Sequence, residues 1–197
     1  GLASRPLPAE PLLRQGLFGQ GTLALGTKSA LAVPLDAVRT DKPEPYVQTI
    51  AAGRVAHTPD EMFALVADIE KYPQFLPLCE ALSIRSRKER DGRTVLIADM
   101  TVGYKAIRET FTTQVLLKPD EKVIDVKYID GPFKYLTNEW AFEPASDGCF
   151  VRFFIDYEFK SRILGVMMGS MFDRAFRMFS EAFEKRADAV YGSSGSA

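Results

Sequence analysis

The chain has 197 residues, of which 46% are hydrophobic and 26% are charged, and its net charge is −1. This composition is typical of one soluble domain, and it excludes a membrane-spanning protein because no apolar run approaches the roughly 18 residues that a span requires. No basic excess exists to neutralise phosphates, which argues against general DNA binding. Cys79 and Cys149 are too few and too distant for a disulfide framework or a zinc site, so we expect two buried thiols in a reducing compartment.

Residues 1–45 differ from the rest of the chain. They hold six of the twelve prolines but one of the 22 aromatic residues, Phe18. Without aromatic residues a segment buries little apolar surface, so we expect a largely disordered N-terminal extension. The folded domain is expected at 46–192, followed by a flexible tail at 193–197.

The domain is expected to begin with a strand over 46–56. Thr58, Pro59 and Glu61 then form a capping-box pattern with proline at the first helical position. The apolar residues that follow have helical spacing: Met62, Leu65, Val66 and Ile69. The sequence therefore predicts a short amphipathic helix after the first strand.

The connector at 70–79 is strongly apolar. Pro73 and Pro77 divide it into a short helical turn and an extended segment. Its apolar side chains are Tyr72, Phe75, Leu76 and Leu78. Such a segment either packs under a sheet or forms the lip of a cavity.

From residue 81 the hydrophobic period changes to two. The expected strands are 81–89, 93–103, 105–117, 122–130, 134–143 and 149–160. Turn sequences such as Asp91-Gly92 and Asp147-Gly148 separate neighbouring strands, and the connections are too short for crossover helices. The pattern predicts an antiparallel meander with one apolar face.

A long helix is expected over 161–191. Ser161 can cap its start, and Gly192 is the residue type that ends helices most readily. About thirty residues at 1.5 Å each give a length of roughly 45 Å. Its first half is apolar nearly all round, so we expect the strands to surround it. The predicted fold is α+β: a curved seven-stranded antiparallel sheet wrapped around this helix, with two short helices after the first strand.

Several residues suggest an apolar cavity between the sheet and the long helix. One face of the strands carries Met100, Val102, Ile124 and Trp140, although a one-residue slip of register would turn them outward. Gly165 and Gly169 leave side-chain volume empty on the helix, which serves either tight packing or a ligand. Met167, Met168, Met171 and Met178 can form an adaptable apolar wall or merely fill a core. Asn138 shares the face of Trp140 and can orient a polar ligand group, unless it is bonded to a loop or lies on the surface.

No catalytic constellation is recognisable. His57, the single histidine, precedes a helix cap, and we expect it to have a surface or capping role. Arg108 and Glu109 are adjacent on a strand, so their side chains point to opposite faces and do not serve one site easily. The sequence lacks a phosphate loop, a metal-ligand spacing and a nucleophile elbow, which favours a binding module over an enzyme.

Particular residues resemble the coenzyme Q-binding protein family, a branch of the START-like, polyketide cyclase-like helix-grip superfamily. The resemblance covers roughly 46–192 and rests on His57-Thr58-Pro59-Asp60-Glu61-Met62-Phe63, Tyr72-Pro73-Gln74-Phe75-Leu76-Pro77-Leu78-Cys79, Arg108-Glu109, Gly131-Pro132-Phe133, Trp140-Ala141-Phe142 and Tyr157-Glu158-Phe159-Lys160-Ser161. It implies a helix-grip fold that holds ubiquinone or a similar prenylquinone in an apolar tunnel, without catalysis and without a catalytic cofactor.

The candidate ligand-binding residues are Phe63, Phe75, Leu76, Pro77, Leu78, Met100, Val102, Ile124, Asn138, Trp140, Gly165, Met168 and Phe172. The implied role is that of a lipid chaperone supporting respiratory electron transport. It includes transient contact with a membrane surface through the connector and the start of the last helix, and contact with respiratory complexes. The implied location is cytoplasmic and peripheral to the inner membrane in a bacterium, or the matrix side of that membrane in a mitochondrion.

Two alternatives remain open. The same sequence neighbourhood includes bacterial toxins that bind ribosomal subunits and block their association, although the evenly mixed charge is unlike a ribosome-binding surface. A cyclase or aromatase enzyme would need polar acid–base groups in the cavity, and the sequence offers Arg108, Glu109 and Asn138. We rank the quinone binder first, the toxin second and the enzyme third.

Overall fold

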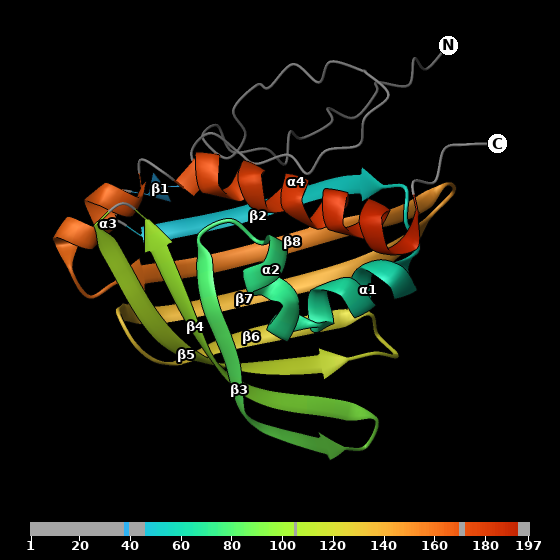
Figure 1. Cartoon of the computed structure of the whole chain (residues 1–197), viewed down its shortest axis with the longest axis horizontal. Helices are drawn as coiled ribbons and strands as arrows, with labels where there is room; N and C mark the ends of the chain where they lie inside the picture. The colour runs from blue at the N-terminus through green and yellow to red at the C-terminus, as the bar shows by residue number, and fades with distance from the viewer. Residues whose placement is uncertain (1–37, 40–45, 105, 170–171, 193–197) are drawn as a thin grey trace, which may run out of the picture.

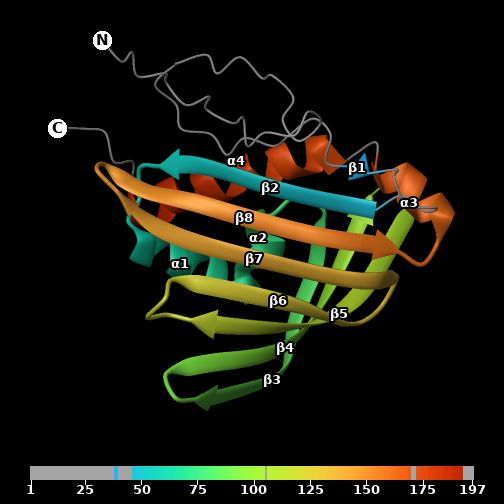
Figure 2. The same ribbon diagram turned by 180° about the vertical axis from the view of Figure 1, so that it is seen from behind.

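An antiparallel sheet forms one layer of the molecule, and the helices cover one of its faces. A computed structural model describes residues 38–39, 46–104, 106–169 and 172–192. Figure 1 shows the long C-terminal helix and the two short helices on the same side of the sheet, whose opposite face is turned to the viewer in Figure 2. The spatial order of the strands is β1-β2-β8-β7-β6-β5-β4-β3, and every neighbouring pair is antiparallel.

The predicted order of elements is confirmed. The strands are β1 Val38–Arg39, β2 Tyr46–Val55, β3 Cys79–Arg90, β4 Arg93–Tyr104, β5 Ile107–Lys118, β6 Val123–Asp130, β7 Phe133–Ala145 and β8 Gly148–Phe159. The helices are α1 Pro59–Ala67, the 3-10 turn η1 Ile69–Lys71, α2 Tyr72–Phe75, α3 Arg162–Gly169 and α4 Phe172–Tyr191.

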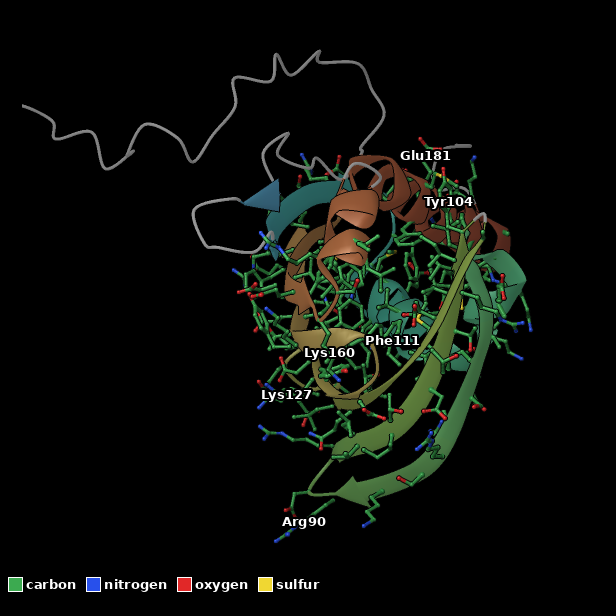
Figure 3. All side chains as sticks on the ribbon, turned by 90° about the vertical axis from the view of Figure 1, so that its left-hand side faces the viewer. Arg90, Tyr104, Phe111, Lys127, Lys160 and Glu181 are labelled. Atoms are coloured by element: carbon green, nitrogen blue, oxygen red, sulfur yellow. The ribbon has the colours of Figure 1, made fainter. Side chains whose placement is uncertain are left out.

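The sheet is curved, and irregularities in strand pairing help to bend it. The register shifts between Ile84 and Ser86 in β3, between Thr112 and Thr113 in β5, and between Phe133 and Tyr135 in β7. An extra residue on one strand bends that strand and increases its local twist. The sheet therefore curls toward the helices, with Phe111 inside the curve in the end-on view of Figure 3.

One feature differs from the sequence prediction. Val38–Arg39 pairs with Tyr46–Val47 and adds a two-residue eighth strand next to the seven that were predicted, while the rest of 1–45 lies outside the described residues. The helix predicted over 161–191 corresponds to α3 and α4, and residues 170–171 between them lie outside the described residues. The tail at 193–197 also lies outside the described residues.

The local signals at the helix ends operate as predicted. The Glu61 amide donates to Thr58 Oγ1 at 3.2 Å, and the Thr58 amide donates to Glu61 Oε2 at 2.8 Å, which completes the capping box. The Leu164 amide donates to Ser161 Oγ at 3.4 Å, and Gly192 has a φ of 88°. These signals start α1 and α3 and end α4.

The core lies between the α1 end of the sheet and the C-terminal half of α4. Val66, Leu96, Ile124, Cys149 and Ala187 are almost completely buried there. Phe63 packs edge to face against Phe142, with ring centroids 6.2 Å apart. Phe63, Phe142 and Ala187 thus belong to a packed core at this end of the molecule, whereas Val66 and Ile124 also border a cavity.

Candidate ligand-binding cavity

Two adjoining apolar cavities lie between the concave face of the sheet and the helices. Their volumes are about 190 and 200 Å³. The side chains that line both of them are Met100, Phe111, Leu136, Ile155 and Phe179. Because they share this wall, the two cavities adjoin each other, and we refer to them together as the channel.

The first cavity lies toward the β4–β5 and β6–β7 turns. Tyr104 and Ile107 border it from the β4–β5 turn, Pro132 from the β6–β7 turn, and Leu164 from α3. The second cavity reaches Val66 of α1, where it ends against the packed core. The channel therefore runs from the α3 end of the sheet toward α1.

The structure settles which face of each strand points inward. Seven of the candidate ligand-binding residues line the channel: Leu76, Leu78, Met100, Val102, Ile124, Asn138 and Trp140. Met100 and Val102 come from β4, Ile124 from β6, and Asn138 and Trp140 from β7. The sequence alone did not determine which face of these strands points inward. In the structure, it is the face that carries the proposed lining residues.

Four other candidates lie away from the channel lining. Phe63 is part of the packed core beside Phe142. Phe75 packs on Phe183 and, together with Pro77, borders a separate shallow groove along α4. Gly165 is buried in α3 but lines neither cavity. The side chains of the two remaining candidates, Met168 and Phe172, lie outside the described part of the structure.

The apolar connector at 70–79 packs against both cavities. Tyr72 and Leu76 line the second cavity, and Leu78 lines the first. Leu78 has a φ of 65°, an uncommon conformation for a branched residue, and its carbonyl accepts from the Gly103 amide at 2.9 Å. Tyr72 donates to the Val66 carbonyl at 2.6 Å, and burial raises the pKa of its hydroxyl. The connector is thus held as one wall of the channel.

Few polar groups face the channel. Asn138 Nδ2 donates to the Phe154 carbonyl at 2.7 Å, so one of its two N–H groups is already used in holding β7 to β8. Thr113, buried on β5, and Ser180 of α4 also line the second cavity. Glu109 lines the first cavity, whereas Arg108 points outward and lies 2.9 Å from Glu80. This confirms that the two adjacent side chains occupy opposite faces.

Several channel residues were not among the sequence candidates. Phe111, Leu136, Ile155, Tyr157 and Phe179 all contribute to the lining. Tyr157 is buried, which raises the pKa of its hydroxyl. The alternation of side chains along a strand could have identified two of them. Leu136 lies two residues before Asn138, and Phe111 lies two residues before Thr113, so each pair shares one face of its strand.

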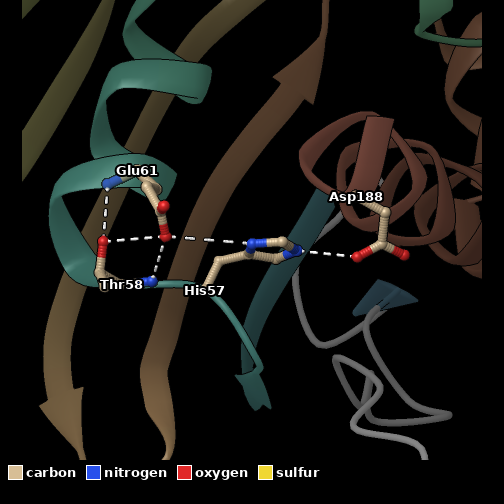
Figure 4. Close-up of polar contacts among 4 residues, drawn as sticks. All are labelled: His57, Thr58, Glu61 and Asp188. Atoms are coloured by element: carbon tan, nitrogen blue, oxygen red, sulfur yellow. Dashed lines mark hydrogen bonds and ion pairs between the residues drawn. The ribbon is translucent and has the colours of Figure 1, made fainter. Parts of the chain in front are cut away.

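His57 has a different position from the one expected. It is only 2% exposed, and its Nε2 donates to Asp188 Oδ1 at 2.8 Å, while Nδ1 lies 4.0 Å from Glu61 Oε2 (Figure 4). The expectation of a surface or capping role was wrong because the partner, Asp188, lies far away in the sequence on α4. His57 joins α1 to α4 at the solid end of the domain and does not line the channel.

Other kinds of site receive no support from the described residues. No group of three or more His, Cys, Asp or Glu side chains within them could hold a metal ion. None of the helices in the described ranges combines the length and apolar character that crossing a bilayer requires. The channel is therefore the strongest candidate site in this part of the chain.

Comparisons with known proteins identify the family. Residues 55–184 match the model for "polyketide cyclase / dehydrase and lipid transport". The chain is 36% identical over 137 residues to the ribosome association toxin RatA of Rickettsia prowazekii, covering 68% of this chain and 91% of that protein. It is 29% identical over 133 residues to the mitochondrial coenzyme Q-binding protein COQ10 of Drosophila melanogaster, covering 66% and 53% of the two chains.

A solved structure agrees with this grouping. The 18 kDa protein CC1736 of Caulobacter crescentus has 34% sequence identity and a TM-score of 0.65, with 74% of this chain and 99% of that chain covered. The family match spans more than half of the chain, and the curved sheet with its C-terminal helix is the corresponding fold. The chain therefore belongs to the polyketide cyclase/dehydrase and lipid transport family, and its fold is the START-like helix-grip fold.

Proposed function

We propose that this protein binds a prenylated quinone, such as ubiquinone, in the channel and does not catalyse a reaction. The observation that carries the proposal is the pair of adjoining, almost wholly apolar cavities between the sheet and the helices. Burial of a prenyl tail contributes roughly 25 cal/mol per Å² of apolar surface. A polar head then needs only one or two hydrogen bonds for orientation. The name of the Drosophila relative supports the ligand class.

The absence of a recognisable acid–base pair supports a binding role. Arg108 is directed outward to Glu80, which leaves Glu109 without a neighbouring cation in the described part of the channel wall. Asn138 is engaged with the backbone of β8. Family membership alone does not decide this point, because the family description includes cyclases and dehydrases.

The proposal is tested by organic extraction of the purified protein, followed by mass spectrometry and a redox-difference ultraviolet spectrum. A prenylquinone present in a stoichiometric amount is the expected result. An empty extract, both from the purified protein and after incubation with quinone-loaded liposomes, would overturn the proposal.

Delivery of such a ligand requires contact with a membrane surface, which we propose occurs at the α3 end. Ile163 is 73% exposed, and its neighbour Leu164 lines the first cavity. Peripheral attachment to the inner membrane and passage of quinone to respiratory complexes are parts of this proposal. In liposome flotation, Ile163→Asp should reduce attachment several-fold. Val190→Asp, which changes a residue that is 49% exposed near the C-terminal end of α4, away from α3, is the matched control and should float like the parent.

Ribosome association is the second candidate function. The specific observation is the 36% identity to the Rickettsia protein named as a ribosome association toxin, which exceeds the identity to the coenzyme Q-binding relative. Cosedimentation with separated ribosomal subunits tests this candidate. Binding that persists after the channel has been emptied of lipid would favour it, whereas protein remaining at the top of the gradient would oppose it.

A further inference from the structure

Glu109 is the one charged side chain lining the channel in the described part of the chain. It lies on β5 between Ile107 and Phe111, two other residues of the lining. In the strand register it stands opposite Val102 of β4, which also faces the first cavity. An acidic residue thus lies in a wall that is otherwise apolar at this point.

The neighbours of Glu109 on the outer face have partners. Arg108 Nε lies 2.9 Å from Glu80 Oε2, and Thr110 Oγ1 lies 2.8 Å from Thr101 Oγ1. Glu109 itself is half-buried and forms neither a hydrogen bond nor an ion pair with another residue of the described ranges. Removing a charged group from water without a partner costs free energy, so a ligand that supplies a hydrogen-bond donor here would gain affinity.

The chemistry of the carboxylate determines which ligand head suits it. An ionised carboxylate accepts hydrogen bonds and donates none. The carbonyl oxygens of an oxidised quinone also only accept, so the two groups repel each other. The hydroxyl groups of the reduced hydroquinone donate. The same site therefore distinguishes the two redox forms of one ligand.

We propose that Glu109 accepts a hydrogen bond from a hydroxyl of a prenylated hydroquinone, so that the channel binds the reduced form in preference to the oxidised form. This inference rests on the proposed function. It concerns binding selectivity only, with no electron transfer within the protein. One hydrogen bond to a charged group corresponds to a preference of roughly ten-fold or more. A ten-fold preference would raise the midpoint potential of the bound two-electron couple by about 30 mV.

The experiment is equilibrium dialysis of the full chain, under nitrogen, against a benzoquinone with a decyl tail and against its hydroquinone. The parent protein is expected to bind the hydroquinone roughly ten-fold more tightly. Glu109→Gln, whose amide both donates and accepts, should bring the two affinities within about two-fold of each other. Glu109→Leu should abolish the preference while the tail still binds. Arg108→Gln, the adjacent change on the outer face, is the matched control and should keep the preference.

The outcomes separate this inference from the proposed function. Equal affinity of the parent for the two forms, or a preference that survives in a folded Glu109→Gln variant, would overturn the role of Glu109 and leave quinone binding intact. Failure of the parent to bind either form would overturn the proposed function, and the inference with it. Circular dichroism of each variant establishes that the fold is retained.

Discussion

His57 and Asp188 are 131 positions apart in the sequence, yet His57 Nε2 lies 2.8 Å from Asp188 Oδ1. The imidazole is almost fully buried, whereas the Asp188 side chain is 48% exposed. Because a carboxylate only accepts, the proton of this hydrogen bond lies on Nε2. The pair attaches the last turns of α4 to the residue before α1, and so joins the beginning of the domain to its end.

Asp188→Ala should therefore destabilise the fold. The substitution leaves the buried Nε2–H without an acceptor, which costs about 1–3 kcal/mol of unfolding free energy. Chemical denaturation monitored by circular dichroism measures the loss. Glu181→Ala, a change at an exposed position on the same helix, should alter the unfolding free energy by no more than about 0.5 kcal/mol. Equal effects of the two substitutions would contradict a structural role for the His57–Asp188 pair.

The capping box predicts a pH dependence of stability. The hydrogen bond from the Thr58 backbone, followed by that from its hydroxyl, holds the pKa of Glu61 below its usual value of 4.5. A carboxyl whose pKa is depressed by folding stabilises the protein above its unfolded-state pKa, and this contribution disappears as the pH falls through the lower folded value. Glu61→Gln should be less stable than the parent at pH 7, and the difference should shrink below about pH 4. Thermal melting of both proteins between pH 7 and pH 3 measures it; a difference that is constant with pH would contradict the assignment.

The shared wall between the two cavities offers a way to block the channel. Met100 lines both cavities, so Met100→Trp should fill their junction and lower the amount of retained ligand several-fold. Overpacking costs about 1–3 kcal/mol of stability, which thermal melting can check. Thr101→Trp, at the next residue but on the outer face, should retain ligand like the parent. Full ligand content in a folded Met100→Trp variant would show that the ligand lies elsewhere.

Both cysteines should react slowly in the folded protein. Burial raises the pKa of the Cys79 thiol and of the Cys149 thiol to about 11 in each case, so little of the reactive thiolate exists at pH 8. Labelling with a maleimide should modify fewer than one thiol in the time that modifies two in the denatured chain. Rapid native labelling of Cys149, which is 0% exposed, would indicate opening of the α1 end of the sheet.

The elements that local signals specify could be predicted from the sequence. Alternation and turn chemistry located the strands from β3 to β8 within a few residues, and the capping box located the start of α1. The channel was predicted only in part, because a period of two identifies residues on one face but not the distance to the opposite wall. Phe63 and Met100 were both candidates for the cavity lining. In the structure, Phe63 lies in the core and Met100 lines both cavities.

Contacts between residues far apart in the sequence account for the other differences between prediction and structure. The burial of His57 depends on Asp188, and no local pattern around His57 contains that information. Glu109 carried a local signal of another kind: it is a charged residue at an inward position of an apolar alternation, between Ile107 and Phe111. A conflict between residue type and pattern is typical of functional positions.

The solid packing at the α1 end has a consequence for the kinetics of the ligand. Because Phe63, Phe142 and Ala187 fill that end, we expect a ligand of the channel to enter and leave past the β4–β5 and β6–β7 turns. On this expectation a tailed ligand enters tail first, and its head stays beside those turns. One ligand then has to leave before the next can enter, and the rate of exchange should fall with every additional isoprene unit in the tail.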